Sequence, residues 1–278
     1  MATHGRRRAL GQHFLMDRAL CDRIAETALS LAEETRSEAL LEIGPGKGAL
    51  TEPLLRMIEE RSAKIQLQEF IISERDPRIA ALWKDRAFPI PTRVELGDFL
   101  ELPEPAWLGR RPLTVLSNLP YSTGTAILIR LARQRAAIPV MVLMFQAEVA
   151  RRLRAEPDTK AWGSLSIWIQ NQWDVTRLAG VPPRSFSPPP KVDSEVVVLR
   201  RRETLRVEIP ANARAEQCWD QLLKACFAHR RKMLRSGLPK SGPLRNALEL
   251  SQVDDTKRAE ALTWSEWNRL YNALSGEK

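Results

Sequence analysis

Residues 39–48 read Ala39-Leu40-Leu41-Glu42-Ile43-Gly44-Pro45-Gly46-Lys47-Gly48, an apolar run of strand length that leads directly into a turn with three glycines. After this turn, Leu50, Leu54, Leu55 and Ile58 recur at the spacing of an amphipathic helix. A strand, a glycine turn and a helix in this order form the opening unit of a nucleotide-binding α/β sheet. The stretch therefore predicts an α/β fold with a ligand site at the turn.

Four further apolar segments of strand length follow along the chain. They are residues 70–73, 93–96, 113–117 and 140–145. A helix is expected before the first strand, at residues 18–33, and a strand pair after the fifth, at residues 175–181 and 196–199. Strands that alternate with helices indicate a mostly parallel sheet, buried on both faces. We therefore predict a Rossmann-like sheet, mostly parallel, with an antiparallel edge hairpin.

The pattern changes after Arg202, where it becomes helical to the end of the chain. The expected helical segments are residues 218–234, 244–250 and 264–274. A chain of 278 residues is long enough for one large domain and one small domain. We predict a sheet domain over residues 1–203 and a small all-helical domain over residues 204–278.

The chain is strongly basic, with 43 lysines and arginines against 34 acidic residues, a net charge of +9 and a pI near 9.9. This surplus favours a polyanionic partner such as RNA, because basic side chains displace condensed counterions. A solvated surface is the alternative interpretation. Basic residues gather at positions 151–154, 200–202 and 230–232. The candidate RNA-binding side chains among them are Arg151, Arg152, Arg230, Arg231 and Lys232.

Cysteines and histidines are few and scattered, three of each, without a CxxC pair. We therefore expect no metal site, and reduced thiols in a reducing compartment. The longest purely apolar run, residues 140–145, is too short to span a bilayer, and no secretory signal is visible. A cytoplasmic protein without a membrane partner is expected. A monomer is expected too, since nothing in the sequence suggests an obligate interface.

Carboxylates stand at the ends of the second and third predicted strands. Gly44 and Gly46 would let the backbone approach a ligand closely and expose N–H groups at a helix start. Glu74 can accept hydrogen bonds from both hydroxyls of a ribose, and Asp98 can accept one from an adenine amino group. A solvated strand end and an ordinary turn residue are the alternatives. Since no second phosphate-binding element is evident, a methyl donor with an adenosine moiety fits better than a dinucleotide.

The fourth predicted strand ends at Asn118-Leu119-Pro120-Tyr121, which suits an exocyclic amine on a planar base. The Asn118 side-chain oxygen and the Leu119 carbonyl can accept the two amino hydrogens, which makes the nitrogen lone pair available. Tyr121 can stack on the face of the base. An Asx turn followed by a buried tyrosine is the structural alternative.

These motifs resemble the KsgA (RsmA) family of ribosomal RNA adenine dimethyltransferases. The resemblance rests first on residues 42–51 and 118–121, and it runs almost from end to end. It extends to residues 11–15, 146–150, 181–183, 188–194 and 230–232, and to Phe186 and Phe227. Several long motifs stand in the family's order, which chance does not readily produce.

The resemblance implies that the methyl donor is S-adenosyl-L-methionine. His13 and Leu15 would then line the methionine end of the donor, and Gly44 would contact the donor through its backbone. Glu74 would hold the ribose, and Asp98 the adenine.

For the target, the resemblance implies that Asn118 contacts both the donor and the amine. Tyr121 and Phe186 would sandwich the target adenine, which must be flipped or single-stranded to reach the pocket. The substrate would be two adjacent adenosines near the 3′ end of small-subunit (16S) rRNA, within a pre-30S particle. The helical domain would help to hold the RNA.

The sequence departs from the family's pattern in two places. Ser122-Thr123-Gly124-Thr125-Ala126 stands where the family usually has Asn-Ile-Ser-Thr-Pro, which bears on the shape of the pocket. Trp162-Gly163-Ser164-Leu165-Ser166 replaces Tyr-Gly-Arg-Leu-Ser, so one basic side chain near the RNA face is missing. The polar stretch 59–69 has no assigned role.

Two alternatives remain open. The first keeps the chemistry but takes large-subunit rRNA, as in the Erm resistance methylases; these generally read Asn-Ile-Pro-Tyr, so Leu119 argues against them. The second is a ribosome-assembly or transcription factor that keeps the fold as a non-catalytic binding module. The presence of Glu74, Asp98 and Asn118 argues against lost catalysis.

Overall fold

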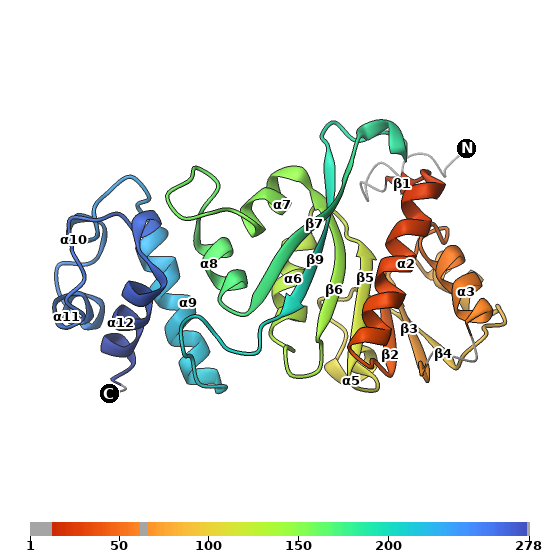
Figure 1. Ribbon diagram of the computed structural model, residues 1–278, viewed down its shortest axis with the longest axis horizontal. Helices are drawn as coiled ribbons and strands as arrows, with labels where there is room; N and C mark the ends of the chain where they lie inside the picture. The colour runs from red at the N-terminus through yellow and green to blue at the C-terminus, as the bar shows by residue number, and fades with distance from the viewer. Residues whose placement is uncertain (1–12, 62–65, 277–278) are drawn as a thin grey trace. The chain divides into compact units, whose positions relative to one another are not determined.

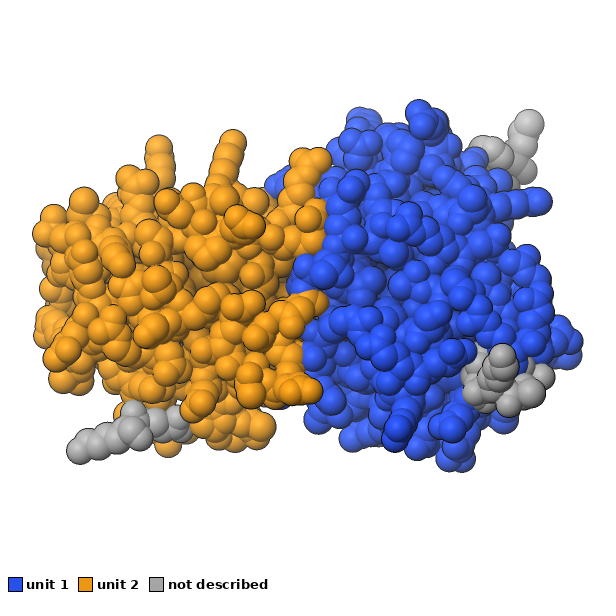
Figure 2. Space-filling model, in the orientation of Figure 1, with its two compact units in different colours: residues 1–150, 175–201 blue, residues 151–174, 202–278 orange. Residues whose placement is uncertain are grey.

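The computed structural model describes residues 13–61 and 66–276. The chain forms two compact units, which Figure 2 shows in different colours. Unit 1 comprises residues 1–150 and 175–201, and unit 2 comprises residues 151–174 and 202–278. Gly11 and Gln12 of the N-terminal motif lie outside the described residues, as do residues 62–65 of the polar stretch 59–69.

Unit 1 is built on a seven-stranded sheet with the order β4-β3-β2-β5-β6-β9-β7 (Figure 1). Its strands are β2 (Ala39–Ile43), β3 (Glu69–Glu74), β4 (Thr92–Leu96), β5 (Leu113–Asn118), β6 (Val140–Gln146), β7 (Trp173–Val181) and β9 (Ser194–Arg201). The strands from β4 to β6 pair in parallel, and β9 runs antiparallel to β6. The predicted fold class, a mostly parallel Rossmann-like sheet, is confirmed.

The strand order reverses direction between β2 and β5. The chain first builds the sheet outward from β2 through β3 to β4, and then returns to add β5 and β6 on the other side of β2. The helices that make these connections are α3 (Thr51–Glu60), α4 (Pro77–Lys84), α5 (Glu104–Leu108) and α6 (Gly124–Ala132). Helix α2 (Arg18–Glu34) precedes β2, and helix α7 (Ala147–Leu153) follows β6. In such sheets, ligands bind outside the carboxyl ends of the strands at this switch point.

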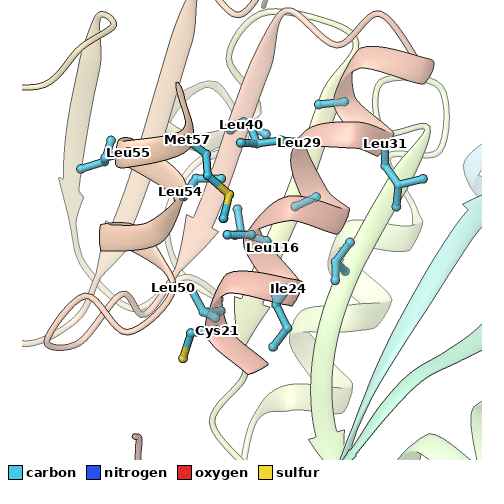
Figure 3. Close-up of a cluster of buried hydrophobic side chains, with 14 of the residues drawn as sticks. Cys21, Ile24, Leu29, Leu31, Leu40, Leu50, Leu54, Leu55, Met57 and Leu116 are labelled. Atoms are coloured by element: carbon cyan, nitrogen blue, oxygen red, sulfur yellow. The ribbon is translucent and has the colours of Figure 1, made fainter. Parts of the chain in front are cut away.

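The core of unit 1 lies between the sheet and the helices α2 and α3. Figure 3 shows Ile24 and Leu29 of α2 together with Leu54 of α3 over Leu40 of the central strand β2. All four side chains are buried, and so is Leu41, which points to the opposite face of β2. Burial on both faces explains why these strands read as mostly apolar segments rather than as alternating ones.

A short second sheet joins the N-terminal segment to a segment far along the chain. β1 (Phe14–Leu15) pairs antiparallel with β8 (Phe186–Ser187), which follows the 3-10 turn η1 (Pro183–Ser185). Leu15 lies opposite Phe186 in this pairing. The ring Nδ1 of His13 also donates to the carbonyl oxygen of Pro188 at 2.8 Å. The N-terminal segment is thereby held by the connection between β7 and β9.

Unit 2 is helical and has its own aromatic core. Its helices are α8 (Ser164–Gln170), α9 (Ala213–Phe227), α10 (Leu234–Gly237), α11 (Pro243–Leu250) and α12 (Trp264–Ser275), with the 3-10 turn η2 (Ala259–Ala261). Trp219 and Trp267 pack edge to face at 5.9 Å between ring centroids. Trp162 and Ile167 belong to this same core. Residues 151–174 therefore pack with the helical unit, whereas the sequence boundary near residue 204 placed them in the sheet domain.

The helix expected over residues 218–234 begins and ends earlier than predicted. It is α9, Ala213–Phe227, and a turn separates it from α10. Within that turn the Arg230 guanidinium donates to the carbonyl oxygens of Lys160 at 2.6 Å and Trp162 at 2.9 Å, and it pairs with Glu260 at 3.0 Å. Tertiary contacts such as these override helix propensity.

Candidate active site

A cavity of about 1300 Å³ lies at the carboxyl ends of β2, β3, β4 and β5, at the switch point of the sheet. The predicted donor-binding residues all line it: His13, Leu15, Gly44, Gly46, Glu74 and Asp98. Asn118, Leu119 and Tyr121 line it as well, and Phe186 does not. Ligand pockets typically measure roughly 300–1,000 Å³. This cavity is therefore large enough for a nucleoside-sized ligand together with a second planar group.

The glycine turn gives the cavity a floor of exposed backbone. Gly44 and Gly46 have φ angles of +68° and +55°, in the left-handed region that favours glycine. A Cβ added at Gly44 would meet no atom within 4 Å, so this side of the backbone faces open space. The turn is fixed from outside by the Trp83 Nε1, which donates to the Gly46 carbonyl at 3.1 Å. A ligand can therefore approach the chain closely here.

Glu74 ends β3 as a buried carboxylate that faces the cavity. Its Oε1 accepts a hydrogen bond from the Asp76 N–H at 2.8 Å, and its Oε2 accepts one from the Gly46 N–H at 3.4 Å. Burial raises the pKa of this carboxyl group above its ordinary value, against these two backbone donors. Each oxygen retains a lone pair, so the pair of oxygens can accept from a vicinal diol.

Glu42, which directly precedes Ile43 and the glycine turn, is a second buried carboxyl group of the cavity wall. The hydroxyl of Thr51 donates to its Oε2 at 2.8 Å. Burial raises the pKa of Glu42 to about 8, and the nearby Glu74 acts in the same direction. Glu42 is therefore protonated at neutral pH, and it adds a hydrogen-bond donor rather than a charge to the wall.

Glu42 is expected to make the stability of the protein depend on pH. The protonated form contributes stability that is fully present below the ordinary pKa of 4.5 and is lost as the pH rises through the folded-state value of about 8. In urea titrations across this window, the free energy of unfolding should fall by up to about 1.4 kcal/mol per pH unit more in the wild type than in Glu42→Gln. Parallel curves for the two proteins would contradict the shift.

Asp98 follows β4 at the third strand end and is held in place by its own turn. Its Oδ1 accepts from the Leu100 N–H at 3.0 Å, and its Oδ2 lies 3.3 Å from the Arg75 guanidinium. Arg75 is a neighbour of Glu74 and also lines the cavity. Sequence reasoning missed Arg75, because no spacing motif links a residue after one strand to a carboxylate after the next.

Asn118 is the last residue of β5 and is half-buried at the cavity. Its side chain makes no hydrogen bond with any residue in the described ranges. The next residue, Leu119, has a buried side chain, and Tyr121 closes the motif. The Tyr121 hydroxyl and the Ser194 hydroxyl lie 2.6 Å apart, and burial raises the Tyr121 pKa. The Tyr121 ring lies against the His13 ring at 5.7 Å between centroids, with planes 30° apart.

Phe186 is the one predicted pocket residue that the structure places elsewhere. Its side chain is only 4 % exposed and belongs to the apolar core of unit 1. In the β1–β8 pairing, Phe186 lies opposite Leu15, which belongs to the same core. Its neighbour Ser187 lines the cavity. Stacking by Phe186 on a base stays a prediction, and it requires the ring to move toward the cavity.

All five predicted RNA-binding residues are exposed: Arg151 and Arg152 in the last turn of α7, and Arg230, Arg231 and Lys232 after α9. Arg230 also binds backbone carbonyls within unit 2, as described above. The basic residues 200–202 make contacts as well: Arg200 pairs with Glu34, Arg201 donates to the Arg135 carbonyl and Arg202 pairs with Asp174.

Within the described part of the chain, no cluster of three or more His, Cys, Asp or Glu side chains could hold a metal ion. Across residues 13–61 and 66–276, no helix has the length and apolar character needed to cross a bilayer.

Comparison with known families and relatives gives one consistent match. The family model described as ribosomal RNA adenine dimethylase matches residues 3–275. A ribosomal RNA small subunit methyltransferase A from Rhodospirillum rubrum is 40% identical, over 94% of this chain and 86% of its own length. The protein of the same name from Geobacter sulfurreducens is 38% identical, over 96% of this chain and 95% of its own length.

Two solved structures with a similar fold cover nearly the whole chain. The 23S rRNA methyltransferase ErmE superposes with a TM-score of 0.62 at 26% identity, over 94% of this chain and 99% of its own. A dimethyladenosine transferase from Plasmodium falciparum superposes with a TM-score of 0.69 at 24% identity, over 93% of this chain and 96% of its own. The second likeness concerns the fold alone.

Proposed function

This chain belongs to the ribosomal RNA adenine dimethylase family, and on that premise we propose that it transfers methyl groups from S-adenosyl-L-methionine to N6 of two adjacent adenosines near the 3′ end of small-subunit rRNA. The observation that carries the proposal is the meeting of Glu74, Asp98 and Asn118 around one cavity at the switch point of the sheet. The carboxylates suit an adenosine-containing donor, and the amide suits an aromatic amine.

The residues of the cavity fit such a donor. Gly44 presents backbone with open space beside it, and the two oxygens of Glu74 can accept from the ribose hydroxyls. Asp98 would accept from the adenine amino group, with His13 and Leu15 at the methionine end. When bound, S-adenosyl-L-methionine supplies an electrophilic methyl group on a sulfonium.

The chain's own groups act on the target amine. The Asn118 side-chain oxygen and the Leu119 carbonyl oxygen each accept a hydrogen bond from the amino group. These bonds draw the nitrogen toward a tetrahedral geometry and expose its lone pair. The proton can leave to solvent after transfer, so no strong base is needed. Tyr121 offers a ring face for the target base, a contact worth about 1–3 kcal/mol. In this proposal Phe186 moves to cover the opposite face.

RNA binding is assigned to the basic surface. The net charge of +9 favours a polyanion, and Arg151, Arg152, Arg231 and Lys232 are exposed for phosphate contacts. Arg230 is exposed too, and its bonds to backbone carbonyls hold its guanidinium in place within unit 2. We propose that the reaction takes place in the cytoplasm, on rRNA within a pre-30S particle. In this proposal the enzyme is a monomer and uses no metal.

Methylation of purified ribosomal particles tests the function. The protein is incubated with labelled donor and unmethylated small subunits, or with large subunits, and the rRNA is then digested to nucleosides. We expect N6,N6-dimethyladenosine from the small subunit only, at two neighbouring positions located by primer extension. Product from the large subunit would support the Erm-like alternative, whose fold this chain shares. Binding to small subunits without any product would support a non-catalytic assembly factor.

A further inference from the structure

A basic side chain from α6 reaches the turn that follows β4. The Arg130 guanidinium donates to the carbonyl oxygens of Phe99 and Leu102, one with each terminal nitrogen. Both acceptors belong to the turn that begins at Asp98. Both carbonyl oxygens thus accept hydrogen bonds from the same planar guanidinium, a geometry that lysine cannot reproduce.

The same guanidinium lies over two neighbouring aromatic rings. Its central carbon is 5.3 Å from the ring centroid of Phe99 and 5.3 Å from that of Trp107 in α5. Both rings are buried and lie 4.9 Å apart. Cation–π contacts of this kind add to the hydrogen bonds and restrict the guanidinium to one position. The turn is therefore anchored to α6 at its backbone and at its side chain.

Asp98 depends on this turn for the direction of its carboxylate. Its Oδ1 accepts from the Leu100 N–H, and its carbonyl oxygen accepts from the Leu102 N–H at 3.0 Å. Arg130 thus binds two carbonyl groups of this turn. N–H groups of the same turn donate to Asp98. We propose that Arg130 is a positioning residue that sets Asp98 for recognition of the donor's adenine, an inference that rests on the proposed function of the cavity.

Helix α6 also begins at the other side of the cavity. The Gly124 N–H at its start donates to the Pro120 carbonyl at 2.8 Å, within the motif that carries Asn118 and Tyr121. One helix therefore joins the proposed amine-binding strand end to the proposed adenine-binding turn. This arrangement sets the distance between the donor's base and the target's amine from a single rigid element.

The proposal is tested by the ratio of the donor site's affinities for two ligands, one with and one without the adenine amino group. This ratio, the base selectivity, depends on the direction of the Asp98 carboxylate and not on protein stability alone. Calorimetry would compare S-adenosylhomocysteine with its purine-riboside analogue, in which hydrogen replaces the exocyclic amino group. For Arg130→Met we expect the affinity for S-adenosylhomocysteine to fall about tenfold while that for the analogue changes less than about twofold. Arg130→Lys should restore part of the selectivity. Lys84→Met, which removes an exposed cation at the end of α4, should behave as wild type.

Asp98→Ala, which removes the acceptor, separates this inference from the proposed function. Loss of selectivity in Asp98→Ala with full selectivity in Arg130→Met would overturn the positioning role and leave the adenine site standing. Equal weakening of both ligands by Arg130→Met would also overturn it, since that pattern indicates general loosening. Wild-type selectivity in Asp98→Ala would remove the adenine assignment itself. Melting temperatures of all variants, measured without ligand, show whether each protein is folded under the conditions used.

Discussion

Replacement of Asn118 by alanine is expected to lower the rate of methyl transfer by about two to three orders of magnitude, the usual cost of losing a group that stabilises developing charge. Asn118 ends β5 at the cavity, and its side chain contributes no hydrogen bond to the described part of the fold. The loss should therefore appear in kcat rather than in the affinity for small subunits. Single-turnover transfer from labelled donor to unmethylated particles measures it.

The control for this variant is Asn246→Ala, which truncates an exposed asparagine on α11 in unit 2. It should transfer methyl groups at the wild-type rate. Particle binding by Asn118→Ala, followed by sedimentation, should be unchanged. If Asn118→Ala and the wild type transfer methyl groups equally fast, Asn118 has no part in the mechanism.

Glu74→Gln is expected to weaken binding of S-adenosylhomocysteine by about two orders of magnitude, because two hydrogen bonds to a charged acceptor contribute roughly 1.5–3 kcal/mol each. The substitution should not unfold the protein. Burial already raises the pKa of Glu74, so a neutral amide of the same shape removes a desolvation cost. Calorimetric titration gives the affinity, and thermal unfolding without ligand gives the stability.

Glu59→Gln provides the matched control, since Glu59 is an exposed carboxylate at the end of α3. Its donor affinity should equal that of the wild type. A Glu74→Gln protein that binds S-adenosylhomocysteine within about twofold of the wild type would rule out hydrogen bonding to the ribose by this carboxylate.

The sheet was predictable because its strands are buried on both faces. Residues 39–43 and 113–117 are mostly apolar without strict alternation, and each is followed at once by the turn or motif that ends the strand. In a parallel sheet those ends meet at one edge, so the position of Glu74, Asp98 and Asn118 around one cavity follows from the strand boundaries alone.

Contacts between side chains of distant segments were not predictable from spacing. Phe186 was expected in the pocket, but it pairs with Leu15 across β1 and β8 and its side chain is buried in the core of unit 1. Arg130 and Arg75 reach the turn at Asp98 from other elements, and basic residues in such positions look like ordinary surface charges in the sequence. Register and side-chain direction, which decide these contacts, emerge only when the sheet has formed.

The division of the chain was predicted only in outline. The change to a helical pattern after Arg202 was visible, but residues 151–174 carry a tryptophan pattern that suits either unit. Their assignment depends on Trp162 and Ile167, which are buried with Trp219. A single boundary in the sequence cannot describe unit 2, because this unit is formed by two separate segments of the chain.

The pairing of β1 with β8 has a consequence for the nascent chain. His13 and Pro188, which are 175 positions apart, must both be present before that wall of the cavity exists. During translation the glycine turn and the first strands leave the exit tunnel well before their partner segment does, and folding of contacts so distant in sequence is slow. A nascent chain in which β8 has not yet been made would carry most of the donor-binding groups, but its cavity would lack the wall that β1 and β8 form. The ability to transfer methyl groups should therefore arise abruptly, when β8 and Pro188 emerge from the tunnel and pair with β1 and His13.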